Sequence, residues 1–457
     1  MLRSALLLLS GNTATAALLF ARNIAVASLI PVADYGVAAT FALAMAAVEM
    51  ASAFGLQQQI VQARDGDAPR LQQALQGFQL LRGVIAALAL LAVAGPLARF
   101  LGIAEAAWAY QVLALVPLCK ALEHFDIHRL NRNRRFGPLV LTGTVPALGA
   151  LLLVWPLAAW LGDWRVMLWA IVFQGITAAA LSHLVAERPY RVLFDRVLWG
   201  RSLRFGWPIL LNAALLFGVF QGDKIIVARV MGMEVLGVFA MAVTLTLTPS
   251  MVLAKTVQTS WLPRLSSAEG PDFTALASRA MILSLMLGAA IAALGVLIAP
   301  VLAAPLAGTG FATLPVLLVP LAILHGLRIT KAGVGVAALS LGFTENAAIS
   351  NLPRLLALIA GGWMLARGAP LLTLIWLGCV GESAGFVLSA MMLRLRAGQS
   401  VRPPWPAIAL AATAFAAATA AATATLSASA ALAISAAAIL GLAILLARPP
   451  RTGDNTA

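Results

Sequence analysis

The sequence predicts an all-α membrane protein that crosses the bilayer many times. Of its 457 residues, 61% are hydrophobic and only 11% are charged, whereas a soluble globular domain carries about 25% charged residues. Apolar segments long enough to span a membrane as helices recur about fourteen times. In addition, the pattern of residues 22–39 returns at residues 223–240, which indicates two similar halves.

The apolar segments follow one another along the chain with short polar loops between them. The first, residues 5–30, begins like a secretory signal peptide, because Arg3 precedes a leucine run. The segment continues well past the small residues that a peptidase would need, so we expect an uncleaved first span. The others are expected near residues 36–56, 77–100, 107–124, 139–161, 166–186, 206–231, 236–259, 279–303, 311–339, 350–367, 370–393, 406–427 and 430–447.

The loops alternate in charge. Most basic residues lie in every second loop: Arg3, Arg64, Arg70, Arg129, Arg132, Arg134, Arg135, Arg188, Arg191, Arg196, Arg201, Arg204, Arg264, Arg394, Arg396, Arg402, Arg448 and Arg451. The other loops hold little beyond Arg165 and Arg367. Basic loops stay in the cytoplasm, so we expect both termini to be cytoplasmic. The net charge of +14 thus reflects topology, and we expect no nucleic-acid partner.

An internal repeat defines the expected domains. When residues 22–39 are aligned with residues 223–240 without a gap, Ile24 matches Ile225 and Gly36 matches Gly237. Both copies read as a helix, a short polar turn and a Gly-Val pair that opens the next helix, and the first copy of the repeat carries Arg22 where the second carries Asp223. We therefore predict six-helix bundles over residues 1–200 and 201–400, and two additional helices with a cytoplasmic tail over residues 401–457, after a kinked Arg402–Pro406 linker. Transporters are often built from such repeats.

Ionisable residues inside the apolar segments are the candidate functional residues. Each charge at mid-membrane costs about 2.5–3.5 kcal/mol on insertion scales, so such residues face a hydrated cavity, pair or reach the interface. Bases outnumber acids on the polar helix faces, which predicts an anion-binding cleft, with Arg offering bidentate phosphate contacts and Lys a point charge. The candidates for binding are Arg22, Lys224, Lys255, Arg328 and Lys331, and those for coupling or pairing are Glu49 and Asp223. The alternative is that Arg22 and Asp223 form a structural ion pair across the repeat.

The sequence contains short matches to catalytic and metal-binding motifs, but their surroundings do not fit those functions. Gly381–Gly385 matches G-x-S-x-G, but that motif needs a strand, a turn and a later His, whereas this one lies in an apolar segment with no His after Ser383. His124 and His128 are four residues apart without an obvious third metal ligand, and Cys119 and Cys379 stand alone. No phosphate-binding G-x-x-x-x-G-K-[ST] loop occurs. We therefore expect no catalytic residue, no metal and no cofactor.

Several stretches resemble the polysaccharide (Wzx-type) flippases of the multidrug/oligosaccharidyl-lipid/polysaccharide (MOP) exporter superfamily. They are PVADYGVAATFALAMAAVEMASAFGLQQQIVQ, NRNRRFGPL, SLRFGWPILLNAALLFGVFQGDKIIVARVMGMEVLGVFAMA and WLPRLSS, so the resemblance covers most of residues 1–393. It implies two six-helix bundles in a V, as in MATE transporters, with the first, second, seventh and eighth helices lining a central cleft. The turn LGFTEN departs from the family pattern because it lacks a basic residue.

The resemblance implies a flippase of the inner cell membrane. Its substrate would be an isoprenoid-diphosphate-linked oligosaccharide, the repeat unit of O-antigen, capsule or exopolysaccharide, moved from the inner to the outer leaflet by alternating access. Expected partners are the lipid-linked oligosaccharide, membrane lipids, a coupling H⁺ or Na⁺ and polysaccharide polymerase machinery. The alternatives are a cation-coupled multidrug antiporter of the same superfamily and an integral-membrane glycosyltransferase or polymerase, which would need a large extramembrane loop.

Overall fold

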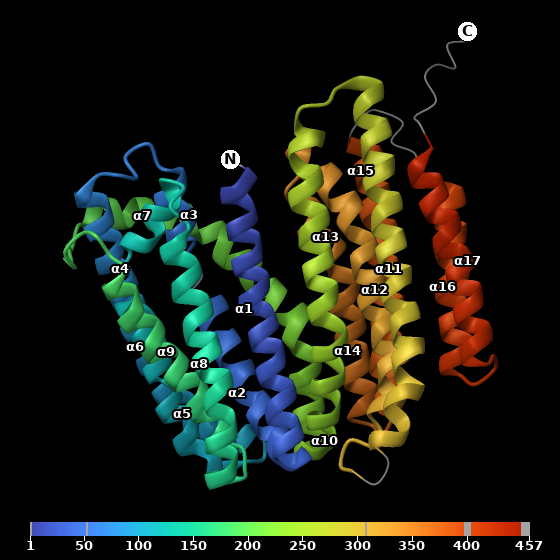
Figure 1. The fold of residues 1–457 in the computed structure, drawn as a ribbon, viewed down its shortest axis with the longest axis horizontal. Coiled ribbons are helices and arrows are strands. Elements are labelled where there is room, and N and C mark those ends of the chain that lie inside the picture. The colour runs from blue at the N-terminus through green and yellow to red at the C-terminus, as the bar shows by residue number, and fades with distance from the viewer. Residues whose placement is uncertain (1, 52–53, 307–308, 397–403, 449–457) are drawn as a thin grey trace. The chain divides into compact units, whose positions relative to one another are not determined.

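The described chain is helical throughout (Figure 1). The computed structural model describes residues 2–51, 54–306, 309–396 and 404–448, and these contain no strand. The predicted linker at Arg402–Pro406 therefore lies partly outside the described residues, and the tail after residue 448 lies wholly outside them. The predicted all-α class is confirmed.

The chain divides into two compact units, Met1–Ala240 and Met241–Ala457. The first unit contains α1 (Leu2–Leu29), α2 (Val32–Ala51), α3 (Leu56–Gln62), α4 (Pro69–Phe100), the short 3₁₀ turn η1 (Ala104–Ala106), α5 (Ala107–Leu113), α6 (Leu115–Leu122), α7 (Asp126–Arg132), α8 (Gly137–Leu161), α9 (Arg165–Leu184) and most of α10 (Arg196–Ser266). The second contains the end of α10, α11 (Gly270–Leu306), α12 (Leu314–Ser340), α13 (Glu345–Ser350), α14 (Leu352–Leu365), α15 (Leu371–Arg396), α16 (Trp405–Ala422) and α17 (Ala428–Ala447). The predicted division of the repeat at residues 200 and 400 stays a prediction.

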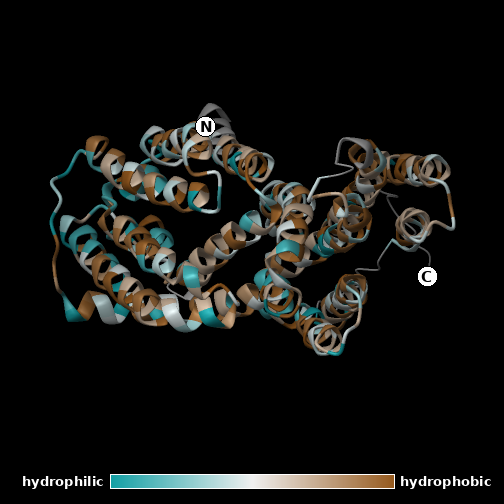
Figure 2. Ribbon diagram, turned by 90° about the horizontal axis from the view of Figure 1, so that it is seen from below, coloured by the Kyte–Doolittle hydropathy of each residue, from teal (hydrophilic) through white to brown (hydrophobic). Residues whose placement is uncertain are grey.

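The helices account for the predicted spans. Among the described residues, 11 helices are long and apolar enough to cross a membrane, and Figure 2 shows that hydrophobic residues recur along most of them. That count takes α10 once, although α10 has two arms, and it leaves out α1 and the α5–α6 pair. The second arm of α10, helix α1 and the α5–α6 pair correspond to the three remaining predicted segments. The segment 107–124 was expected as one helix, but the structure interrupts it at Ala114.

Helix α10 bends at Gly232, where the sequence predicts a helix end. Gly232 has φ 84° and ψ −179°, a backbone conformation that glycine adopts without steric cost. The helix resumes directly after Gly232, so the polar turn expected before Leu236 is reduced to this one residue. Gly232 thus separates the two arms of α10, which correspond to the predicted segments 206–231 and 236–259.

The repeat-related glycines meet in the first unit. A Cβ on Gly36 of α2 would overlap the carbonyl oxygen of Met233, and a Cβ on Gly237 of α10 would overlap that of Val32. The sequence offset that carries Gly36 onto Gly237 also carries Val32 onto Met233. The two contacts are therefore equivalent under the repeat, as in the isologous interface of a two-fold dimer.

In the second unit α11 is the central helix. It packs against α12, α16 and α17, and Gly288 and Gly326 bring the backbones of α11 and α12 together, because a Cβ on either would meet the other's carbonyl oxygen at 2.5 Å. Alanines of α16 and α17 pack against Ile282, Leu285 and Ala289 of α11. Small residues give close approach where lipid offers no hydrophobic drive for association.

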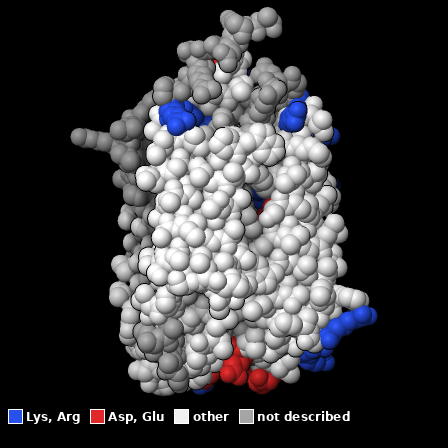
Figure 3. All heavy atoms as spheres, turned by 90° about the vertical axis from the view of Figure 1, so that its right-hand side faces the viewer, with Lys and Arg blue, Asp and Glu red and all other residues white. Residues whose placement is uncertain are grey.

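Most exposed charges on the face in Figure 3 lie toward its two ends. Lys and Arg lie at the upper end, both acidic and basic side chains lie at the lower end, and the band between them is nearly free of charge on its surface. Such a band indicates a surface that faces lipid, because charged side chains exposed to hydrocarbon are costly. The protein is therefore a multi-pass membrane protein.

Candidate functional site

Arg22 is a buried cation in the first unit. It lies on α1, is 7% exposed, and donates from Nη1 to Oε1 of Gln174 on α9 at 2.7 Å. The amide of Gln174 is neutral, and no carboxylate of the described residues lies within ion-pair distance of Arg22. Within the described part of the chain, Arg22 and Asp223 thus form no ion pair, and the guanidinium of Arg22 has no counter-charge.

The other candidates of this unit have partners. Glu49 of α2 forms an ion pair with Lys120 of α6. Asp223 is 5% exposed and accepts the backbone N–H of Lys224 at 2.9 Å, while Lys224 Nζ donates to Oε1 of Gln221 at 3.1 Å. The acid at position 49 is therefore neutralised within its own unit.

In the second unit, Arg328 and Lys331 converge on one acid. Both lie on α12, and both contact Glu382 of α15, whose side chain is fully buried: Arg328 Nε is 2.8 Å from Oε1 and Lys331 Nζ is 2.6 Å from Oε2. Arg354 Nε of α14 lies 4.0 Å from the same carboxylate, and Lys331 also donates to Asn351 at 3.0 Å. Arg328, Lys331 and Arg354 thus lie around one buried carboxylate and form with it the Glu382 cluster.

Lys255 lies elsewhere in the second unit. Its side chain is exposed on the second arm of α10 and forms no ion pair with a described residue. Thr248 and Gln258 follow the same stripe and are half-buried and exposed. The ammonium is therefore accessible, as its predicted role requires, but that role stays a prediction.

Sequence reasoning missed two members of the Glu382 cluster as site residues. Glu382 was noted as a charge inside an apolar segment but was not chosen as a site residue, and Arg354 was overlooked although it lies in the predicted segment 350–367. A complete count of charges in apolar segments would have added Arg354. Their mutual contact is not readable from the sequence, since it joins α14 to α15 across a loop.

The G-x-S-x-G stretch serves packing. Ser383 lies within α15 and donates to the carbonyl of Cys379 at 2.9 Å. A Cβ on Gly381 would meet the Pro353 carbonyl at 2.9 Å, and a Cβ on Gly385 would meet that of Ser350 at 2.4 Å. The glycines let α15 approach α13 and α14, and the strand–turn–helix of a nucleophile elbow is absent from this described segment.

The fold is that of MOP superfamily transporters. The chain is similar to the lipid II flippase MurJ in an inward closed conformation, with 10% identity over 96% of this chain and 98% of that chain and a TM-score of 0.73. An inward-facing multidrug resistance MATE family transporter of the MOP superfamily gives 17% identity, 84% and 94% coverage, and a TM-score of 0.69. A MOP superfamily transporter from Pyrococcus furiosus, described as having a binding pocket of reverse polarity, gives 15% identity, 87% and 95% coverage, and a TM-score of 0.60. Identities this low establish the fold alone.

These observations define a multi-pass membrane protein with a transporter fold and buried cations in its helices. Comparison with curated protein sequences finds no match. The chain belongs to the family of polysaccharide biosynthesis proteins, whose model matches residues 25–276. The resemblance seen in the sequence is thereby confirmed for family and fold.

Proposed function

We propose that the protein is a flippase for isoprenoid-diphosphate-linked oligosaccharides, which it moves from the inner to the outer leaflet of the inner cell membrane. The observation that carries this proposal is Arg22, a buried guanidinium whose hydrogen-bond partner among the described residues is the neutral amide of Gln174. An uncompensated buried charge is costly, so a ligand that neutralises it is a reasonable cause for its presence.

The proposed anion contact is the diphosphate. In the first unit, Arg22 offers the remaining donors of its guanidinium, whose Nε is buried without a hydrogen-bond partner among the described residues, and Lys224 would add a point charge. In the second unit, Lys255, Arg328 and Lys331 are the proposed contacts for an anion. An inside-negative potential favours export, since each charge gains about 2.3 kcal/mol per 100 mV, or about 5 kcal/mol for two negative charges.

The acids favour this substrate over cationic drugs. A drug antiporter would need carboxylates available to a cation, but Glu49 pairs with Lys120 and Glu382 is enclosed by Arg328, Lys331 and Arg354. Cationic drugs would meet like charge at these positions. Cells expressing the protein should therefore gain no resistance to cationic drugs.

Arg22→Ala tests the proposal in a strain that lacks the native gene. We expect the variant to insert normally, to lose export roughly ten- to hundredfold, as for a lost charged hydrogen bond of about 1.5–3 kcal/mol, and to leave lipid-linked oligosaccharide in the cytoplasmic leaflet. Arg22→Lys should keep part of the activity. Arg367→Ala is the matched control, because Arg367 stacks on Trp363 at 3.7 Å outside the proposed site. If the wild-type gene itself fails to restore export, the proposed function is wrong.

A further inference from the structure

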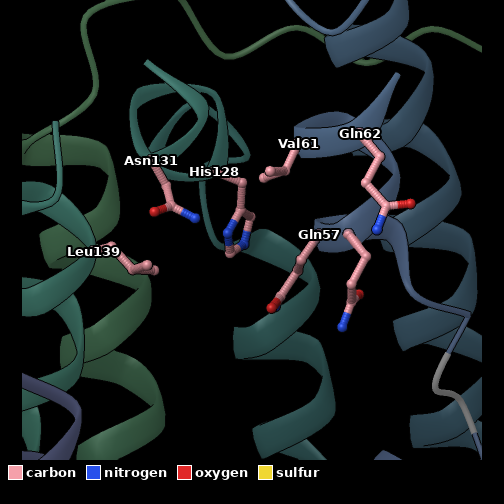
Figure 4. Close-up of a pocket in the computed structure, with 7 residues that line it drawn as sticks. Gln57, Val61, Gln62, His128, Asn131 and Leu139 are labelled. Carbon is pink, nitrogen blue, oxygen red and sulfur yellow. The ribbon is translucent and has the colours of Figure 1, made fainter. Parts of the chain in front are cut away.

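A pocket lies between α3, α7 and the start of α8, in the first unit. Its volume is about 280 Å³. Four carboxamide side chains and one imidazole line it, together with Val61 and Leu139 (Figure 4): Gln57, Gln58, Gln62, Asn131 and His128. The positive-inside rule places these segments at the cytoplasmic end of the protein, because Arg64 and Arg129 flank them.

The polar side chains of this pocket have unused hydrogen-bonding capacity. None of the five donates or accepts a side-chain hydrogen bond within the described chain. His128 is only 5% exposed, and its ring contacts the ring of Phe125 at a centroid distance of 5.0 Å. Because the ring of His128 is directed into the pocket (Figure 4), its nitrogens can form hydrogen bonds with a group bound there.

The walls of the pocket are held in place. Arg132 of α7 donates from Nη1 to the carbonyls of Ile60 at 3.2 Å and Val61 at 2.7 Å, which fixes the end of α3. Arg132 also pairs with Asp67 at 3.2 Å, and Asn133 donates to the same carboxylate at 3.0 Å. The apolar face of α3 packs into a core with Phe78 and Phe125. Such a preformed site does not spend binding energy on ordering its walls.

The lining selects a neutral polyhydroxylated group. No Lys, Arg, Asp or Glu is among the described residues that line the pocket, so neither a phosphate nor a metal ion would find a counter-charge. Burial lowers the pKa of His128 to about 4, which keeps the ring uncharged at neutral pH. Carboxamides both donate and accept hydrogen bonds, as vicinal sugar hydroxyls do, and the aliphatic side chains can cover the C–H face of a ring. The volume, near the lower end of about 300–1,000 Å³ for small-molecule sites, suits one sugar ring.

We propose that this pocket binds one neutral sugar ring of the lipid-linked glycan at the cytoplasmic end of the first unit. The inference rests on the proposed function, and it deepens that function by separating recognition of the glycan from recognition of the diphosphate. Gln58 and Gln62 are four residues apart on α3 and exposed, so their replacement does not disturb a core.

The experiment measures binding to the full-length protein in lipid nanodiscs. The probes are an isoprenoid diphosphate without sugar and the same lipid carrying one glucose, galactose, N-acetylglucosamine or N-acetylgalactosamine. We expect at least one glycosylated probe to bind wild-type protein about tenfold more tightly than the bare diphosphate. The double variant Gln58→Leu with Gln62→Leu should lose that difference and keep its affinity for the bare diphosphate. Gln111→Leu, which alters an exposed glutamine on α5, should behave like wild type.

The outcomes separate the two proposals. If wild-type protein binds the bare diphosphate but no sugar improves binding, or if the double variant keeps the sugar preference, the pocket holds water only and the inference is overturned. An equal loss for all probes in the double variant would also overturn it, because it would show a structural effect. If wild-type protein binds no probe at all, the proposed function fails first.

Discussion

Replacing Glu382 with glutamine should destabilise the second unit strongly. The change keeps the size of the side chain and removes the carboxylate that lies among Arg328, Lys331 and Arg354. At separations of 2.8 and 2.6 Å, each attraction is about 6 kcal/mol for an effective dielectric constant near 20. Desolvation offsets much of this, and removing one partner of a buried ion pair costs about 3–5 kcal/mol in practice.

Thermal unfolding of the purified protein in detergent measures this effect. For a unit of about 150–250 residues, 1 kcal/mol corresponds to about 2–4 °C, so Glu382→Gln should lower the midpoint by on the order of 10 °C. Glu345→Gln is the matched control, because its ion pair with Arg396 is exposed, at 50% and 38% for the two side chains, and worth about 0–1 kcal/mol. Its midpoint should move by less than about 4 °C.

A second substitution distinguishes charge from packing. Adding Arg328→Gln to Glu382→Gln removes one of the stranded cations, so the double variant should be destabilised by less than the sum of the single changes. Millimolar pyrophosphate should raise the midpoint of Glu382→Gln more than that of wild-type protein. A shift for Glu382→Gln no larger than that for Glu345→Gln would refute the reasoning, because the carboxylate would then not be neutralising a buried cluster.

Three further outcomes are expected. Reporter fusions after Asn133 should indicate the cytoplasm and fusions after Thr309 the periplasm; the opposite result at Asn133 would invert the topology. Lys255→Ala should insert normally but lose export, Lys255→Arg should retain part of it and Lys255→Glu should be the most defective, as measured by surface polysaccharide; normal export by Lys255→Ala would remove this residue from the anion site. Burial lowers the pKa of His128 to about 4 in the folded protein, whereas the pKa is about 6.5 in the unfolded chain. The folded state therefore keeps its full stability above pH 6.5 and loses up to about 3 kcal/mol as the pH falls toward 4. His128→Gln should flatten this part of the stability–pH curve, and an unchanged slope would contradict the assignment.

The helices were readable from the sequence because hydrocarbon imposes a strict rule on the backbone. A chain segment in lipid must satisfy its N–H and C=O groups internally, so length and hydropathy nearly suffice to locate it. The bend at Gly232 was also foreseeable, since glycine is the residue that tolerates a positive φ. The break at Ala114 was overlooked, although Pro117 signals it, because a proline has no N–H to bond the carbonyl of Leu113 and its ring clashes with that carbonyl.

The charge partners were harder to predict than the helices. Periodicity places Arg328 and Lys331 on one face of a helix, but it cannot say whether that face binds an anionic ligand or pairs with a carboxylate of the protein. The structure places Glu382 there. Likewise, the offset of the repeat relates Arg22 to Asp223, whereas the described contact of Arg22 is the amide of Gln174. The repeat shows that two residues occupy equivalent positions in their helices. Which side chain each of them contacts depends on which helices are neighbours in the fold.

The contact between Gly36 and Gly237 has a mechanical consequence. The backbones of α2 and α10 are in direct contact there, since Gly36 and Gly237 themselves place no side chain between the two helices. Helices that pack through ridges and grooves must disengage side chains before they change their crossing angle. These two glycines add no such obstacle of their own, so the steric cost of a change in angle is low at these positions. A larger residue at position 36 or 237 would hold the two helices apart.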